Sequence, residues 1–110
     1  NKVKYVIANE GDNFNSIADE FKLTKRQLLS YNDLDKKTVI YPGQELYIKP
    51  KKKRSDSHFP IHIAQEGETM QQISQQYAVK LKSLCQYNNM KADDVPEEGQ
   101  EIFMRNKMKR

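Results

Sequence analysis

The sequence contains one internal repeat, and this feature constrains the fold more than any other. Residues 5–49 align with residues 61–105 at a constant shift of 56 positions and without a gap, and twelve of the 45 aligned positions are identical. The identical pairs are Ile7/Ile63, Ala8/Ala64, Glu10/Glu66, Gly11/Gly67, Ile17/Ile73, Leu28/Leu84, Tyr31/Tyr87, Asn32/Asn88, Val39/Val95, Gly43/Gly99, Gln44/Gln100 and Glu45/Glu101. A match of this length with its glycines in step indicates two copies of one unit.

The repeat divides the chain into two small domains. We expect domains at residues 5–49 and 60–105, a basic linker at 50–59 and a basic tail at 106–110. A unit of about 45 residues is close to the lower limit for a core without disulfides or metals. Such a unit has little interior to spare, so we expect a shallow surface groove and not a buried active site.

Each copy has the pattern of a strand, two helices and a second strand. Apolar residues at 14, 17, 18 and 21 fall on one face of a helix, and the second copy repeats this spacing at 70, 73 and 77. Asn13, Thr24 and Thr69 are suitable N-caps, whereas Lys80 occupies the position of Thr24 and predicts a weaker cap. Short extended runs at 5–8 and 61–64 open each unit, and alternating residues at 46–48 and 102–104 close it. The predicted fold class is therefore α+β, with two β-α-α-β domains in tandem, each with a two-stranded antiparallel sheet.

The distribution of charge argues against a nucleic-acid-binding domain. The formal net charge is +4, yet residues 5–48 contain seven acids and five bases, and residues 60–104 contain seven acids and three bases. The excess of positive charge therefore lies in the connecting segment and at the two ends, whereas a nucleic-acid-binding domain usually carries a basic patch on its folded surface. No apolar stretch approaches the ~20 residues of a membrane span.

The residues that could support catalysis or metal binding are few and badly spaced. Cys85 with His58 or His62 suggests a thiol nucleophile, but Cys85 aligns with the apolar Leu29, where a free cysteine is commonly a small buried hydrophobe. Two histidines and one cysteine without ligand spacing make a poor metal site. No motif places a pair of acids for acid/base catalysis. We therefore predict no catalytic residue, no metal and no cofactor in this chain.

Two ordered motifs in each copy resemble the LysM domain. The first is ANEGDNFNSIA at residues 8–18 and HIAQEGETMQQI at 62–73, and the second runs from Leu28 to Leu46 and from Leu84 to Ile102. The resemblance covers about 90 residues and implies the β-α-α-β fold. It also implies a non-catalytic module that binds peptidoglycan or chitin through N-acetylglucosamine. Paired copies with a Lys-rich connector look most like the tail of a bacterial N-acetylglucosaminidase, which would place the chain in the bacterial cell envelope behind an upstream hydrolase domain.

The resemblance also implies which residues bind the glycan. In the family the ligand groove lies between the first strand–helix loop and the loop after the second helix. Carried over to the first copy, these loops contain Gly11, Asp12, Asn13, Phe14, Asp33, Leu34, Val39 and Ile40. In the second copy they contain Gly67, Glu68, Thr69, Met70, Asn89, Met90, Val95 and Pro96. Asn13, Glu68 and Pro96 depart from the usual family residues, so the two grooves are expected to differ in preference.

Several of these residues also have a purely structural interpretation. Phe14 and Met70 begin an apolar helical face and are more often core than ligand floor. Acids at 12 and 68 are favoured near a helix N-terminus by the helix dipole alone. Asn32 and Asn88 are typical loop-forming residues. A protein-interaction or structural spacer with the same fold and no sugar binding is therefore the alternative function.

The connecting segment contains a basic run, Lys51 to Arg54. Three interpretations remain open: a solvated linker, attraction to an anionic envelope polymer or lipid, and a nuclear address or nucleic-acid contact. As a flexible linker, the connecting segment would span ~18 Å and would let both units bind the same polymer. The chain also begins at Asn1 without Met or an apolar signal segment, and we expect it to be a piece of a longer protein.

Overall fold

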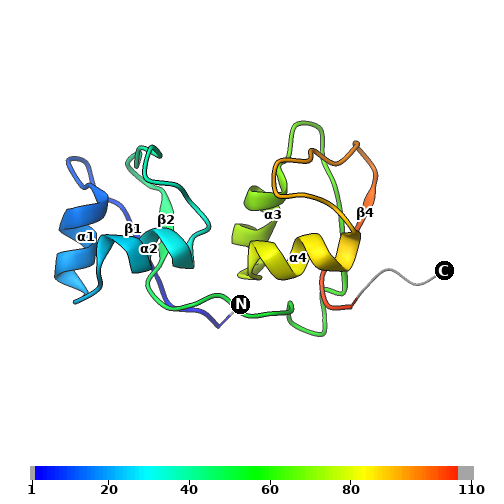
Figure 1. Cartoon of the computed structure of the whole chain (residues 1–110), viewed down its shortest axis with the longest axis horizontal. Coiled ribbons are helices and arrows are strands. Elements are labelled where there is room, and N and C mark those ends of the chain that lie inside the picture. The colour runs from blue at the N-terminus through cyan, green and yellow to red at the C-terminus, as the bar shows by residue number, and fades with distance from the viewer. Residues whose placement is uncertain (1, 107–110) are drawn as a thin grey trace. The chain divides into compact units, whose positions relative to one another are not determined.

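The computed structural model describes residues 2–106, which form two compact units at residues 2–51 and 52–106. Each unit has the element order strand, helix, helix, strand (Figure 1). The first contains β1 (Tyr5–Ile7), α1 (Phe14–Glu20), α2 (Lys25–Tyr31) and β2 (Glu45–Tyr47). The second contains β3 (Ile61–Ile63), α3 (Met70–Tyr77), α4 (Leu81–Asn88) and β4 (Glu101–Phe103). This order confirms the predicted α+β fold.

The two strands of each unit pair with each other. β1 and β2 are antiparallel with Val6 opposite Leu46, and β3 and β4 are antiparallel with His62 opposite Ile102. Leu46 and Ile102 are fully buried and belong to the apolar clusters that the helices of each unit also form. Each sheet is therefore a two-stranded ribbon with one face against its helices, as two-stranded ribbons require for stability.

The predicted helix starts agree with the observed caps. Asn13, Thr24 and Thr69 each accept a hydrogen bond from the backbone N–H three residues later, and all three belong to capping boxes. Lys80 makes no side-chain cap at the start of α4. The two copies thus differ in how their second helix begins.

Each unit has its own apolar core. The first core contains Ala8, Phe14, Ile17, Ala18, Leu28, Leu46 and Ile48, and the second contains Ala64, Met70, Ile73, Val79, Leu84, Cys85, Ile102 and Met104. The burial of Cys85 confirms its interpretation as an apolar helix residue. These small clusters contain the buried apolar residues on which the packing of each unit depends.

A buried asparagine joins the second helix to the closing strand in both units. In the first unit, Asn32 Nδ2 donates to the carbonyls of Leu28 and Tyr47, and Asn32 Oδ1 accepts from Tyr47 N–H at 2.7 Å. Asn88 makes the same three bonds with Leu84 and Phe103. Asn32 and Asn88 therefore hold the second helix of each unit against its closing strand, an arrangement that we call the asparagine bracket. This structural role explains the identity of the two residues better than sugar contact does.

The connecting segment differs from the flexible linker that its composition predicts. Lys51 belongs to the first unit, where its Nζ lies 2.7 Å from Asp33 Oδ2 and its side chain is 1% exposed. The pKa of Lys51 lies below its usual value because burial outweighs the hydrogen bond and charge of Asp33. The first residue of the basic run is therefore a folded part of the first unit.

The rest of the connecting segment bonds to the second unit. Lys52 N–H donates to the carbonyl of Ala78 at 2.8 Å, and Lys80 N–H donates to the carbonyl of Lys52 at 2.7 Å. The Tyr87 hydroxyl donates to the carbonyl of Lys53, and Arg105 donates to the carbonyl of Ser55. The composition of this segment reflects only its side chains, whereas hydrogen bonds of its main-chain groups fix its position.

Candidate functional site

The first loop of the candidate site connects β1 to α1 in the first unit. Gly11 has a φ of +89°, a conformation that favours glycine, and no atom lies near the place where a Cβ would be. Gly11 is therefore required by the turn and not by a close contact. Asp12 Oδ2 accepts the Asn9 N–H at 2.8 Å and Asp12 Oδ1 accepts the Ser16 hydroxyl at 3.1 Å. The carboxylate thus fixes the loop to the first turn of α1.

The second loop follows α2 and approaches the first. Asp35 Oδ1 accepts the Lys37 N–H at 2.8 Å and the Thr38 hydroxyl at 3.3 Å, and the Thr38 N–H donates to the Asp35 carbonyl. This turn places Val39 and Ile40 next in the chain, with Val39 81% exposed. An apolar side chain is therefore displayed on a loop whose backbone is held by its own hydrogen bonds.

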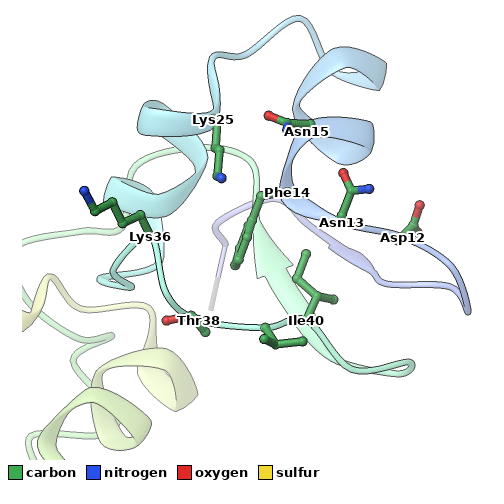
Figure 2. Close-up of a pocket in the computed structure, with 9 residues that line it drawn as sticks. Asp12, Asn13, Phe14, Asn15, Lys25, Lys36, Thr38 and Ile40 are labelled. Carbon is green, nitrogen blue, oxygen red and sulfur yellow. The ribbon is translucent and has the colours of Figure 1, made fainter.

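Between these two loops lies a groove of about 230 Å³ (Figure 2). Its lining comprises Asp12, Asn13, Phe14, Asn15, Lys25, Lys36, Thr38, Val39 and Ile40. The structure therefore brings together five of the eight residues predicted for this copy: Asp12, Asn13, Phe14, Val39 and Ile40. Phe14 belongs both to the core and to the groove, since its side chain is 5% exposed and still contributes to the lining.

The other three predicted residues of the first copy lie outside this groove. Gly11 forms the turn beside it, and Asp33, with a φ of +52°, pairs with Lys51. Leu34 instead lines a neighbouring open hollow of about 570 Å³. The hollow is lined by Lys25, Arg26, Leu29, Ser30, Leu34 and Lys36. Groove and hollow share two lysines and thus adjoin each other.

The second unit builds the same two turns. The Glu68 N–H donates to the Gln65 carbonyl at 3.1 Å, as Asp12 N–H does to Asn9 at 3.0 Å in the first unit. The Asp94 N–H donates to the Lys91 carbonyl at 3.0 Å, which corresponds to the Thr38 turn. The backbone scaffold of the candidate site is therefore the same in both copies.

The predicted residues of the second unit differ in exposure. Val95 is 60% exposed and corresponds to Val39, whereas Met70 is 0% exposed and belongs entirely to the core. Pro96 is buried, Thr69 caps α3, and Asn89 takes a left-handed conformation with a φ of +54°. Met90 is half-buried, and its sulfur lies 3.7 Å from Gln100 Nε2. The side chains at the surface of the two sites are therefore different.

A polar network holds the first loop of the second unit and has no counterpart in the first. Glu68 Oε1 lies 2.8 Å from His62 Nε2 and accepts the Gln65 N–H at 2.7 Å, and His62 Nδ1 lies 2.8 Å from the Tyr77 hydroxyl. The first unit has Val6 and Phe21 in place of His62 and Tyr77. Glu68 is therefore tied to the sheet and to α3 as well as to its own turn.

This network shifts two pKa values. Burial by itself raises the pKa of Glu68, but the hydrogen bonds from His62 and the Gln65 N–H, with the His62 charge, outweigh it and leave the pKa below its usual value. Burial, and secondarily the charge of Glu68, raises the pKa of the Tyr77 hydroxyl. Glu68 is therefore held as a carboxylate that accepts hydrogen bonds from the protein.

Sequence reasoning missed four groove residues and the histidine network. Asn15, Lys25, Lys36 and Thr38 line the groove but are not among the residues predicted from the sequence. The alignment of the copies places Leu81 and Ala92 opposite Lys25 and Lys36, but the flanking positions also differ between the copies, so no sequence signal identifies these lysines.

Two searches of the described residues, 2–106, gave negative results. No group of three or more His, Cys, Asp or Glu side chains within that range is arranged to hold a metal ion. No helix in the same range is long and apolar enough to span a membrane.

The comparisons with known proteins identify the repeated unit. A family model described as the LysM domain matches residues 7–49 and 62–105. The comparison with curated proteins returned no match. Among solved structures, the chain is similar to the spore cortex-lytic enzyme SleL of Bacillus cereus, with 26% identity and a TM-score of 0.41 over 98% of this chain and 24% of that one. SleL of Bacillus megaterium QM B1551 is 17% identical, with a TM-score of 0.41 over 94% of this chain and 23% of that one.

The family assignment rests on the two matched segments, since the chain spans only about a quarter of the length of these enzymes. LysM domains are binding modules of cell-wall-associated proteins and generally bind peptidoglycan and other N-acetylglucosamine-containing glycans. The matched segments cover most of both repeats and coincide with the two β-α-α-β units. The chain therefore belongs to the LysM domain family, with two copies of the domain in tandem.

Proposed function

We propose that this chain is a non-catalytic module that anchors a cell-wall enzyme to peptidoglycan or a related N-acetylglucosamine polymer. The observation that carries the proposal is the groove between the β1–α1 loop and the loop at residues 35–40, because it combines an apolar floor with polar walls. Phe14, Val39 and Ile40 offer surface for the C–H faces and acetyl methyls of a sugar. Asn13, Asn15 and Thr38 offer donors and acceptors for its amides and hydroxyls.

The size of the groove argues for weak binding at a single site. Its volume of about 230 Å³ lies below the range of roughly 300–1,000 Å³ that is typical of small-molecule pockets. Two domains in one chain raise the effective concentration of the second binding event to the millimolar range when the linker is short. A repeating polymer therefore suits this chain better than a short sugar does.

We also propose that the chain lies in the bacterial cell envelope and follows a hydrolase domain of the same polypeptide. A module that holds an insoluble polymer is useful to an enzyme that acts on that polymer, and the similar SleL chains are described as cortex-lytic enzymes. This part of the proposal predicts a hydrolase domain in the full-length protein.

Co-sedimentation with purified insoluble peptidoglycan tests the proposal. We expect the chain to sediment with the polymer and Val39→Asp with Val95→Asp to remain in the supernatant, since both valines are exposed and their replacement leaves the cores intact. Loss of an apolar contact at each site reduces affinity by about tenfold per site.

The matched control is Ser57→Asp with Gln76→Glu, which adds the same negative charge at exposed positions outside both pairs of turns. This control should sediment like the wild type. Failure of the wild-type chain to sediment at low salt would favour the spacer function instead, and equal loss in both double variants would show non-specific charge attraction.

A further inference from the structure

The basic side chains of the first domain gather beside its groove. Residues 5–48 contain five basic residues against seven acids, and three of the five, Lys25, Arg26 and Lys36, line the hollow next to the groove. Lys25 and Lys36 also line the groove itself. Three of the five basic residues between positions 5 and 48 therefore lie around the candidate site.

Within residues 2–106, these cations have no counterion. Over residues 2–106, no ion pair or side-chain hydrogen bond involves Lys25, Arg26 or Lys36. The acid that lines the groove, Asp12, already accepts hydrogen bonds from the Asn9 N–H and the Ser16 hydroxyl. The ammonium groups are thus available to a negatively charged ligand.

The geometry places the cations beside apolar surface. Figure 2 shows the Lys25 side chain projecting from the start of α2 toward the Phe14 ring, whereas Lys36 directs its nitrogen away from that ring. The lining of the adjoining hollow includes Leu29 and Leu34 as well as the basic residues. An apolar floor with a cationic rim fits a carboxylate on a short aliphatic body.

The second domain keeps one of these three bases, since Lys82 stands in place of Arg26, and lacks the other two. Leu81 and Ala92 stand in place of Lys25 and Lys36, and Asp94 stands in place of Thr38. The positions that correspond to the groove lining therefore contain two acids, Glu68 and Asp94, and no base. The two domains present opposite charge to a ligand in otherwise equivalent loops.

We propose that the groove and hollow of the first domain select a glycan that carries carboxylates, held by Lys25 with Lys36, whereas the second domain takes uncharged N-acetylated sugar. This inference rests on the proposed function and specifies its substrate class. Peptidoglycan offers such carboxylates on the lactyl group of its muramic acid and on its peptide stems, and chitin offers none. The chain would then distinguish the two polymers through its first domain only.

The test compares two oligosaccharides of equal length in titrations of the full chain, followed by the amide shifts of Gly11 and Gly67, which report on the two domains separately. One is a chito-oligosaccharide, and the other is a peptidoglycan fragment. We expect Lys25→Gln with Lys36→Gln to weaken binding of the peptidoglycan fragment at the first domain by about three- to tenfold, the range for a partly exposed charge pair. Binding of the neutral sugar should change less than about twofold.

Lys49→Gln is the control, because Lys49 is exposed and lines neither the groove nor the hollow. An equal loss for both oligosaccharides, or no loss for either, would overturn the inference while leaving the proposed function intact. If the wild-type chain bound neither oligosaccharide, the proposed function itself would fail. A fragment freed of its peptides distinguishes the two sources, since retained selectivity assigns the lactyl carboxylate and lost selectivity assigns the peptide.

Discussion

The two LysM domains share a backbone and differ in what they attach to it. The turn bonds before the first helix, the strand register and the asparagine bracket occur in both copies with nearly equal distances. The side chains that secure the loops differ: the first domain pairs Asp33 with Lys51, and the second links Glu68 to His62 and Tyr77. The backbone geometry is therefore shared, whereas the side chains that hold the loops differ between the two domains.

The asparagine bracket should carry the largest energetic effect, and equally in both domains. Asn32→Ala leaves the buried N–H and C=O of Tyr47 without their side-chain partner, and Asn88→Ala does the same at Phe103. We expect each change to cost its own domain about 2–4 kcal/mol of unfolding free energy. Urea unfolding followed by domain-specific amide signals measures this.

The control for the bracket is Asn9→Ala, which removes an exposed asparagine side chain from the first loop and should cost less than about 0.5 kcal/mol. If Asn32→Ala lowered the unfolding free energy of its domain only slightly while Asn88→Ala lowered it strongly, the claim that the two domains share one scaffold would be contradicted.

The ion pair of the first domain should give the next largest effect, and in one domain only. Asp33→Asn keeps a residue that tolerates the left-handed conformation but leaves the buried Lys51 ammonium without its carboxylate. We expect a loss of about 1–3 kcal/mol, since the Asp33 side chain is partly exposed. The reciprocal change Asn89→Asp, at an exposed position with the same conformation, should alter stability by less than about 0.5 kcal/mol. Equal effects would show that Lys51 does not depend on Asp33.

The N-terminus of α4, where Lys80 makes no side-chain cap, predicts a smaller change in stability of the opposite sign. Lys80→Thr gives α4 the N-cap that Thr24 gives α2, and we expect it to stabilise the second domain by about 0.5–1 kcal/mol. Thr24→Lys should destabilise the first domain by a similar amount. Thermal unfolding of both variants measures the difference, and a destabilised Lys80→Thr variant would contradict the prediction that α4 lacks only a side-chain cap.

The histidine network predicts a pH effect confined to the second domain. The folded-state pKa of Glu68 is below its usual value of 4.5, so its stabilising contribution is complete above about pH 4.5 and is lost as the pH falls through the lower folded-state pKa. His62→Val, which copies Val6 of the first domain, should raise the Glu68 pKa and move this loss to higher pH. Carbon-13 titration of the Glu68 carboxyl measures the shift, and His58→Ala in the connecting segment should leave it unchanged.

The sequence predicts the scaffold well because its determinants are local or periodic. Helical spacing located the cores, capping residues located the helix starts, and the repeat showed that both units share one fold. The burial of Lys51 could not be predicted in the same way, because it depends on Asp33, which lies 18 positions earlier in the chain. From composition alone, any basic run is expected to be exposed to solvent. Lys25 and Lys36 were not predicted for a related reason. No local sequence pattern distinguishes an exposed lysine beside a groove from one on the solvent-facing side of a helix.

The most direct test of the account is a titration of the full chain with an N-acetylglucosamine oligomer, observed through backbone amide shifts. We expect saturable shifts at residues 11–14 and 38–40 of the first domain and at residues 67–70, 94 and 95 of the second, where Pro96 has no amide N–H. Saturating oligomer that leaves all of these amides unmoved, or that moves only amides of the sheets, would contradict a sugar-binding groove between the two loops.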